Sequence, residues 1–315
     1  MTSYIIRKLA ATLPTIIGVV TFTFLMLRLA PGDTIDYILG GYEVTMTQEQ
    51  IDAARARLGL DQPLHVQYYI YIKGILTGDL GQSYYQQAPV TELLLSRVPT
   101  TLQLAFAAVL ISALIGLPSG LISALKPNTL MDYFVTTIST IGLAAPNFWL
   151  GILLLYLFSF RLDWFPLFGS GSGNVLSTLH HLVLPALTLG VSGAALVARM
   201  TRSAVLEVLR QDYVRTARAK GLTERLVVGR HVMRNALMPV VTVLGLEIAY
   251  LLGGSIVIEV VFARRGLGKL LIDALHERDY PVVQGGVLII VIAIAVVNVF
   301  VDLMYAILNP RITYD

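Results

Sequence analysis

The stretch YVRTARAKGL, residues 213–222, carries three positive charges, Arg215, Arg218 and Lys220, and has Gly221 near its end. It interrupts a chain of 315 residues that is 56% hydrophobic and only 14% charged, whereas a soluble domain carries about 25% charged residues. Long apolar runs flank it on both sides. The composition therefore predicts an integral membrane protein, in which this stretch is a loop between two spans.

The apolar runs predict an all-α membrane protein with six transmembrane helices. A helix that crosses a bilayer core of about 30 Å needs about 20 apolar residues. Six runs reach roughly this length, at 9–29, 100–125, 133–160, 182–200, 236–262 and 283–308. The third run contains LAAPNFWL, where Pro146 predicts a kink or a break. Gly116 and Gly120 in the second run allow either a close helix approach or a kinked helix end.

These runs divide the chain into three parts. Residues 1–30 are expected to form the N-terminal transmembrane helix, 31–99 a small extracytoplasmic cap, and 100–310 a five-helix core whose largest polar loop is 199–235. Within the cap, TQEQIDAARARLGL predicts a short amphipathic helix that ends at Gly59.

Lysine and arginine predict the orientation of the chain. With the N-terminus in the cytoplasm, 13 of these residues face inward and nine face outward. Four of the outward nine lie in the long 30–99 segment, which counts least in such a comparison. We therefore expect both termini, including Arg7, Lys8 and Arg311, and the loop 199–235 to be cytoplasmic.

The loop 199–235 holds nine bases and three acids. Such a loop can act merely as an orientation signal that contacts lipid headgroups. However, an apolar stripe at i, i+3, i+4 and i+8 from Val205 to Tyr213 predicts a short amphipathic helix. Gly221 permits a sharp turn after it. A helix, a turn and a second helical piece would form a projection that docks into a groove on a soluble partner.

Acidic residues within spans are costly and are candidates for function. Three qualify, Glu247, Glu259 and Asp302. Glu259 lies near the outer end of its span, where headgroups can solvate it, and Asp302 lies where an arginine at the helix end can pair with it. Glu247 is the most interior, and a translocation-pathway role and a pairing between helices are equally open. With Asn147 of the broken span, it is a candidate pathway residue.

No motif supports an enzyme. The segment GLGKLL at 266–271 lacks the first glycine of a nucleotide-binding loop, because Ala263 stands there. GVSG at 190–193 resembles the serine motif of rhomboid proteases, but the last span, 283–308, contains no histidine to act as base. The sequence has no cysteine and offers no convincing metal ligands, so no cofactor or metal is predicted. ATP, if used, must bind to a separate chain.

Several stretches carry a family resemblance. They are LGLDQPLHVQY, GDLGQSY, RVPTTLQLA, PNFWLGILLL, YVRTARAKGL followed by RHVMRNALMPVVTV, LLGGSIVIEVVF, RDYPVVQG and VDLMYAILNPRI. Together they cover nearly the whole chain. The sequence resembles the inner-membrane permease subunits of binding-protein-dependent ABC importers, and most of all the dipeptide, oligopeptide and nickel branch.

The resemblance implies a type I importer permease and a role for the basic loop. In this superfamily the loop carries Glu-Ala-Ala, two residues and Gly, and the matching positions here are Thr216, Ala217, Arg218 and Gly221. It also implies the partners: a second, similar permease, two ATPase subunits and an extracytoplasmic solute-binding protein in a bacterial inner membrane. A di- or oligopeptide is the expected solute. The residues expected to contact an ATPase subunit are Arg215, Thr216, Ala217, Ala219, Lys220 and Gly221.

One departure and two other hypotheses accompany this interpretation. Relatives usually have Trp-Pro where this chain has Arg264 and Arg265 before Gly266. A self-sufficient ion-coupled carrier would use the intramembrane acids, but such carriers often show inverted repeats and none is visible. A membrane scaffold without transport is also compatible with the composition. The net charge of +3 gives no support for nucleic-acid binding.

Overall fold

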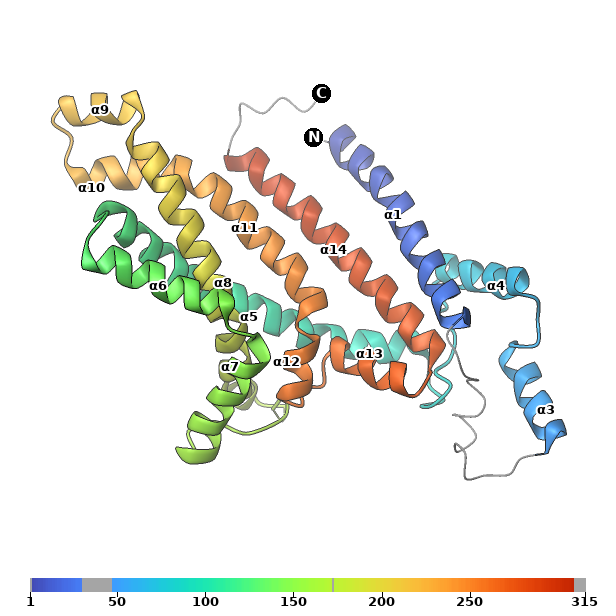
Figure 1. Ribbon diagram of the computed structural model, residues 1–315. Coiled ribbons are helices and arrows are strands. Elements are labelled where there is room, and N and C mark those ends of the chain that lie inside the picture. Colours follow the sequence, from blue (N-terminus) through green and yellow to red (C-terminus); the bar gives the residue numbers. More distant parts are fainter. Residues whose placement is uncertain (1, 30–46, 172, 309–315) are drawn as a thin grey trace.

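A computed structural model describes residues 2–29, 47–171 and 173–308, and in these residues the regular structure is helical (Figure 1). The elements are α1 (Thr2–Leu29), α3 (Gln48–Leu58), α4 (Leu64–Thr77), α5 (Val90–Leu125), α6 (Leu130–Ala144), α7 (Asn147–Leu154), η2 (Leu155–Arg161), α8 (Val175–Leu209), α9 (Asp212–Ala219), α10 (Glu224–Leu226), η3 (Val227–Val232), α11 (Met233–Gly254), α12 (Ile256–Val261), α13 (Leu267–His276) and α14 (Tyr280–Leu308). The segments η2 and η3 are π-helical continuations of α7 and α10.

Within the described residues, five helices are long and apolar enough to cross a membrane, or six if one bent pair is a single span. The bent pair is α6 with α7 and η2, which meet at 102°. Ala145 and Pro146 have extended backbones at the bend, because proline has no N–H for a helical bond and disfavours a helical residue before it. The break predicted within LAAPNFWL is therefore confirmed.

Two helices run further than the apolar runs predicted. The helix α5 begins at Val90 rather than near residue 100, and Pro99 lies inside it. The division expected between residues 99 and 100 therefore falls within a helix. The helix α8 spans 35 residues around Pro185, well beyond the predicted 182–200.

The centre of the bundle is the contact between α5 and α8. A Cβ atom added at Gly116 would lie 2.7 Å from the Cβ of Val197, and one at Gly120 would lie 2.7 Å from the Cβ of Thr201. The two glycines therefore allow a close approach of α5 to α8, as small residues do between membrane helices. Of the two sequence hypotheses for these glycines, the close approach is correct.

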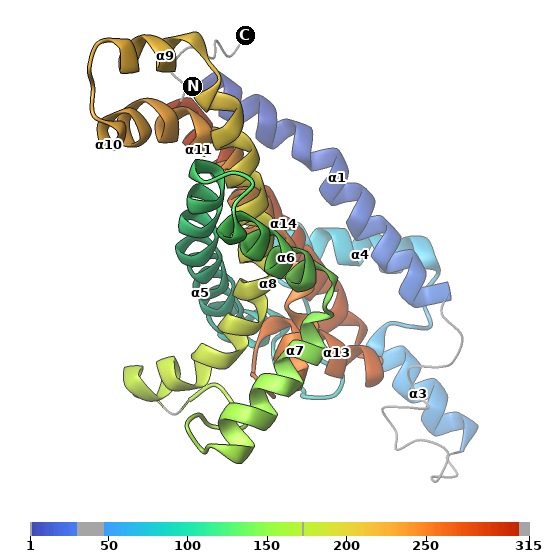
Figure 2. The same cartoon turned by 60° about the vertical axis from the view of Figure 1, so that its left-hand side comes forward.

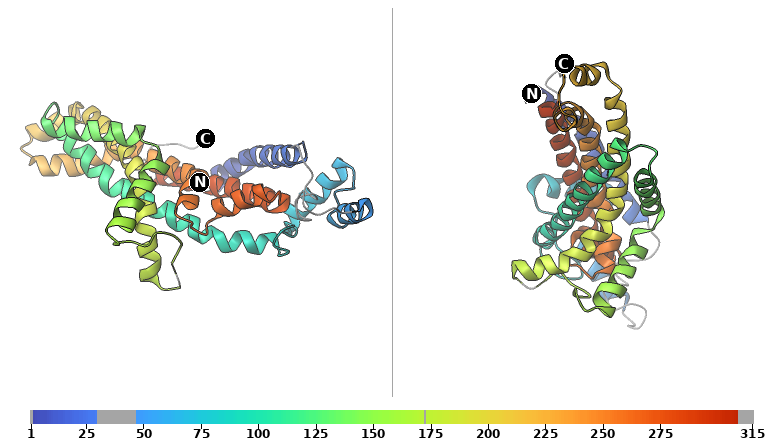
Figure 3. Two further views of the ribbon diagram at one scale, coloured as in Figure 1. Left: turned by 60° about the horizontal axis from the view of Figure 1, so that its bottom comes forward. Right: turned by 90° about the vertical axis from the view of Figure 1, so that its left-hand side faces the viewer.

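The N-terminal helix packs along α14 and is hydrogen-bonded to α4. The Arg28 side chain donates from Nε to Gln67 Oε1 at 2.7 Å, and its guanidinium lies 4.9 Å from the ring centroid of Tyr280. Figure 1 and Figure 3 show α4 next to the end of α1 and α3 farther out, both away from α8 and α11. The short helix predicted within TQEQIDAARARLGL is confirmed as α3, which ends at Leu58, directly before Gly59 with φ of +66°. Residues 31–46 of the expected cap lie outside the described residues.

The basic loop projects from one end of the molecule. Figure 1 shows α9 and α10 at the same end as the start of α1 and the end of α14. This placement agrees with a topology in which the loop and both outer helix ends share one side of the membrane. Arg7, Lys8 and Arg311 lie outside the residues whose side chains the structure describes.

Candidate functional site

The helix that carries the basic stretch is separate from the span before it. The span α8 ends at Leu209, Gln211 has an extended backbone, and α9 begins at Asp212 (Figure 2). The prediction that the apolar stripe from Val205 to Tyr213 lies on one helix is therefore wrong. The two ends of the stripe lie in two helices joined by a sharp turn at Arg210 and Gln211, a turn marked by neither glycine nor proline.

The loop has an apolar core of its own. Val214 and Ala217 are three residues apart on α9, so they lie on one face of the helix and both are buried. They belong to a cluster with residues from the neighbouring helices, namely Ala124, Ala204, Val205, Val227, Val232 and Ala236. Packed interiors have low compressibility and transmit strain, so a displacement of α9 would be passed to the elements that share this cluster, η3, α8, α5 and α11.

The opposite face of α9 and the turn that follows it, with Lys220 and Gly221, are exposed, and Arg215 and Lys220 make this surface basic. The Arg215 side chain is 77% exposed, and the other exposed members of the predicted contact are Thr216, Ala219, Lys220 and Gly221. Ala217 differs, because it is only 6% exposed and packs into the loop core. Five of the six predicted contact residues therefore form one accessible surface, and the sixth supports it from below.

The turn after α9 is held by a glycine and an ion pair. Gly221 has φ of +80°, a left-handed conformation that side chains with Cβ atoms disfavour. Across the turn, Arg218 donates from Nη2 to Glu224 Oε1 at 2.6 Å and from Nε to Glu224 Oε2 at 3.1 Å. This two-point contact fixes α10 against α9, as bidentate arginine–carboxylate pairs do.

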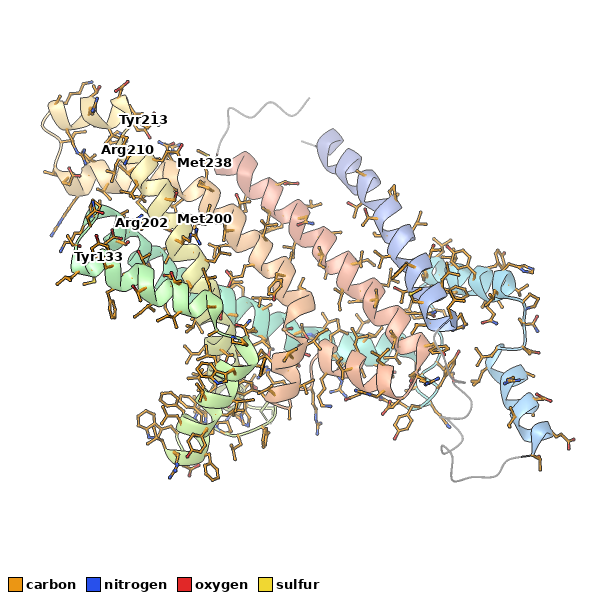
Figure 4. All side chains as sticks on the ribbon, viewed as in Figure 1. Tyr133, Met200, Arg202, Arg210, Tyr213 and Met238 are labelled. Carbon is orange, nitrogen blue, oxygen red and sulfur yellow. The ribbon has the colours of Figure 1, made fainter. Side chains whose placement is uncertain are left out.

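A second contact fixes α9 to the following span. Asn235 on α11 donates from Nδ2 to the hydroxyl oxygen of Tyr213 at 2.8 Å. In Figure 4, Tyr213 and Arg210 lie where α8 turns into α9. The start of α9 is thus hydrogen-bonded to α11 in addition to its apolar packing.

A partly buried ion pair lies below the loop, where α6 meets α8. Arg202 donates from Nε to Asp132 Oδ1 at 2.7 Å and from Nη2 to Asp132 Oδ2 at 2.8 Å. Ser123 donates to the same carboxylate, and so does the backbone N–H of Asn128, at 2.9 Å. Figure 4 shows Arg202 and Met200 on α8 and Tyr133 on the adjacent α6. The pair joins three helices, α5, α6 and α8.

An open cavity of about 560 Å³ lies between the α6–α7 bend, α8 and α11. The bend contributes residues 142–147. The helix α8 contributes positions from Leu189 to Leu196, and α11 contributes positions from Val243 to Leu251, in each case at intervals of three and four residues. These intervals place the lining on one face of each helix. Both predicted pathway residues, Asn147 and Glu247, line this cavity.

Glu247 reaches from α11 toward α5 and α8. It is 8% exposed, and its Oε1 accepts a hydrogen bond from the hydroxyl of Ser112. A Cβ atom at Gly193 would overlap the Glu247 carboxyl group in this position, so a side chain there would displace it. Ser112 and Gly193 were not expected from the sequence. The sequence shows only that each position has a small side chain, and this does not indicate which residue of another helix lies against it.

The GVSG segment is part of the cavity wall. Ser192 donates from Oγ to Asn147 Oδ1 at 2.5 Å, which connects α8 to the first residue of α7. Gly190 packs against Ile111 on α5, where an added Cβ would lie 2.7 Å from the Ile111 Cβ. Packing and hydrogen bonding explain this segment without a hydrolytic role for its serine.

Glu259 is buried rather than solvated by headgroups. It is 0% exposed, accepts from Thr101 Oγ1 at 2.6 Å, and accepts from the backbone N–H of Lys269 at 3.0 Å. The latter contact caps the first turn of α13. Arg264, also 0% exposed, donates from Nη1 to the carbonyl of His181 at 3.2 Å. The residue that departs from the Trp-Pro pattern is thus packed against the start of α8.

The sequence matches two family descriptions that together cover most of its length. Residues 116–314 match the "Binding-protein-dependent transport system inner membrane component". Residues 1–105 match the N-terminal region described for the same membrane components. The chain belongs to this family.

Relatives of this permease are similar over their full lengths. It is 43% identical to the di/tripeptide transport system permease protein DppB of Pseudomonas aeruginosa, with both chains covered completely. It is 39% identical to the oligopeptide transport system permease protein AppB of Bacillus subtilis and 42% identical to the glutathione transport system permease protein GsiC of Salmonella paratyphi A, again over the whole of each chain.

Solved structures show the same fold. The permease superposes on a chain of the MetNI methionine ABC transporter in an inward-facing conformation with a TM-score of 0.57 at 23% identity. The match covers 69% of this chain and 96% of the other. The fold is therefore that of ABC importer permeases.

Family membership decides between the hypotheses from sequence. The chain is a permease subunit of an ATP-driven importer in the peptide branch of the family, and it is not an enzyme. ATP hydrolysis belongs to separate ATPase subunits. The self-sufficient ion-coupled carrier is not favoured.

Proposed function

We propose that α9 is the coupling helix of this permease and that an ATPase subunit binds its exposed basic face. The observation that carries the proposal is the division of α9 into a buried face and a charged face. Val214 and Ala217 fix the helix to the spans, while Arg215 and Lys220 point outward. Movement of a bound ATPase would therefore displace the spans together with the helix.

The cavity between α6, α7, α8 and α11 is proposed to be part of the translocation pathway. Asn147 and Glu247 would contact the solute there, since both line the cavity. A di- or oligopeptide is the proposed solute. The support is that relatives covering the whole chain are named for di/tripeptide and oligopeptide transport. The apolar lining with few polar groups suits a small molecule held loosely.

The proposed assembly contains this chain, a second permease, two ATPase subunits and a binding protein that delivers the solute from outside. The pathway would lie between the two permeases, which alternate between inward- and outward-facing states. Both termini and α9 would face the cytoplasm, in agreement with the excess of lysine and arginine in the loop 199–235. Six spans and an extracytoplasmic cap that includes α3 and α4 complete this arrangement.

Charge reversal on α9 tests the coupling role. The double variant Arg215→Glu, Lys220→Glu is expected to lower solute-stimulated ATP hydrolysis by the reconstituted assembly on the order of tenfold or more. The reason is that misplaced like charges across an interface cost several kcal/mol. Lys126→Glu is the matched control, because Lys126 is exposed in the α5–α6 connection and lies outside α9. Stimulated hydrolysis that is equal in the wild type and the double variant would exclude the proposed contact.

A further inference from the structure

One carboxylate oxygen beside the cavity has no protein partner. Glu247 Oε1 accepts from Ser112, whereas Oε2 is buried and has no hydrogen-bond partner among the described residues. In the other polar pair of the cavity wall, Ser192 donates to the amide oxygen of Asn147. An unpaired buried carboxylate oxygen costs free energy, so its retention points to a ligand.

The fold leaves space for this carboxyl group on the cavity wall. Gly193 faces it, and any side chain at that position would overlap it. Glu247 and Gly193 both line the cavity. The carboxyl group of Glu247 therefore occupies space that a side chain of α8 would otherwise fill. The Ser112 hydroxyl holds one oxygen in place, and this leaves the other as the acceptor for a guest.

The lining defines the chemistry of that guest. Glu247 is the single charged residue that lines the cavity, and no lysine, arginine or histidine lines it in the described residues. The remaining lining is mostly aliphatic, with Tyr250 contributing an aromatic ring. A carboxylate can only accept hydrogen bonds, so the complementary group is a cation with N–H donors on a small, partly apolar body.

We propose that Glu247 is the subsite for the ammonium group of the transported solute, and that for a peptide this group is its N-terminal amine. This inference rests on the proposed function, since it names the solute group that the pathway contacts. The ammonium donates to Oε2 of Glu247, while Ser112 keeps Oε1 oriented. The aliphatic face of α8 and the bend between α6 and α7 accommodate the side chains.

Thiol chemistry tests the subsite without ATP or a binding protein. The sequence contains no cysteine, so Val243→Cys gives this chain a single thiol in the cavity, one helical turn from Glu247. The assembly in nanodiscs is treated with aminoethyl methanethiosulfonate, which carries an ammonium, or with neutral propyl methanethiosulfonate. The intact mass of this chain reports each modification rate, and the ratio of the two rates removes differences in thiol reactivity.

The ratio is expected to fall on the order of tenfold when Glu247→Gln is added, because a unit charge about 6 Å away is lost in a partly hydrated cavity. Glu247→Asp and Ser112→Ala, which keep the charge, should retain the ratio. A ratio that is the same in the Val243→Cys chain with and without the Glu247→Gln change would overturn the subsite.

A second arm uses Val243→Cys with Glu247 intact, so it stays decisive even if Glu247→Gln fails to fold. Alanyl-alanine is expected to slow modification by the neutral reagent, and N-acetyl-alanyl-alanine, which lacks the ammonium, is expected to have a much smaller effect. Equal protection by both dipeptides would overturn the proposal. An assembly that takes up no peptide but keeps the Glu247-dependent rate ratio would instead contradict the proposed function, so the two failures are distinguishable.

Discussion

Replacing Arg202 by alanine is expected to lower the free energy of unfolding by about 3 kcal/mol. The change removes two charge-assisted hydrogen bonds to Asp132, at 2.7 and 2.8 Å. Each such bond contributes about 1.5–3 kcal/mol. The Asp132 side chain is 4% exposed, and among the described residues its carboxylate keeps Ser123 and the Asn128 N–H as donors. Breaking a buried pair costs about 3–5 kcal/mol. Because the Arg202 side chain is 32% exposed, we expect the cost here to lie at the lower end of that range.

The double-mutant cycle isolates the pair from other effects of each change. Asp132→Ala alone should also cost about 3 kcal/mol, because Ser123 and Asn128 lose their acceptor as well. The double variant should cost about 4 kcal/mol rather than the sum, which gives a coupling energy of about 2 kcal/mol. Unfolding in mixed micelles with increasing dodecyl sulfate measures all three variants.

A surface pair in the same loop provides the control. Arg215 and Asp212 are 3.8 Å apart and their side chains are 77% and 97% exposed. Exposed pairs of this kind contribute little, so their cycle should show no coupling beyond experimental error. The reasoning is refuted if the Asp132–Arg202 cycle is additive to within about 0.5 kcal/mol, which is the agreement found for independent sites.

Three further changes have defined outcomes. Gly221→Ala should lower the unfolding temperature, because φ of +80° costs a residue with Cβ about 1–2 kcal/mol; Gly229→Ala, also in open space, should not. Gly120→Leu should separate α5 from α8 and abolish the monodisperse peak of the assembly in size exclusion. Burial, and then the charge of Asp273, raise the pKa of Glu277 in the folded chain, so its ionisation opposes folding. Glu277→Gln should therefore raise the unfolding temperature at neutral pH, with the gain vanishing below about pH 4.

The sequence predicted elements better than it predicted their ends. Pro146 marked the bend correctly because proline acts on its own helix. The prediction placed the start of α5 where the apolar run begins. The helix itself begins earlier, at Val90, and Pro99 lies inside it without breaking it. The turn at Gln211 was missed because an ordinary polar residue makes it, so no local signal separates α8 from α9.

The cavity shows a different limit of sequence reasoning. Asn147 and Glu247 were identified separately as polar residues within spans, and the structure brings both to one cavity. Helical spacing shows which residues share a face, but not which faces of different helices meet. Ser112 and Gly193 contact Glu247 only because faces of different helices meet there, so their part in the site could not be predicted from the sequence. Glu259 was expected near headgroups. Its burial was missed because it depends on the tertiary packing of the short helix α13.

The contacts between α9 and the cavity form a continuous route through three helices. Val214 and Ala217 of α9 share one apolar cluster with Ala204 and Val205 of α8. Arg202 joins α8 to Asp132 on α6, and α6 ends at the bend that lines the cavity. We infer that α6 and α8 move together when α9 moves, while the extended backbone at Pro146 allows the bend to change.

Arg202→Ala should therefore affect coupling as well as stability. In assemblies that remain intact, ATP hydrolysis without solute should continue, but its stimulation by solute should fall, because α6 no longer follows α8. Arg202→Lys keeps the charge without the two-point contact and should have an intermediate effect. If intact Arg202→Ala assemblies keep full stimulation by solute, the route from α9 to the cavity does not pass through this pair, which hydrogen-bonds α8 to the start of α6.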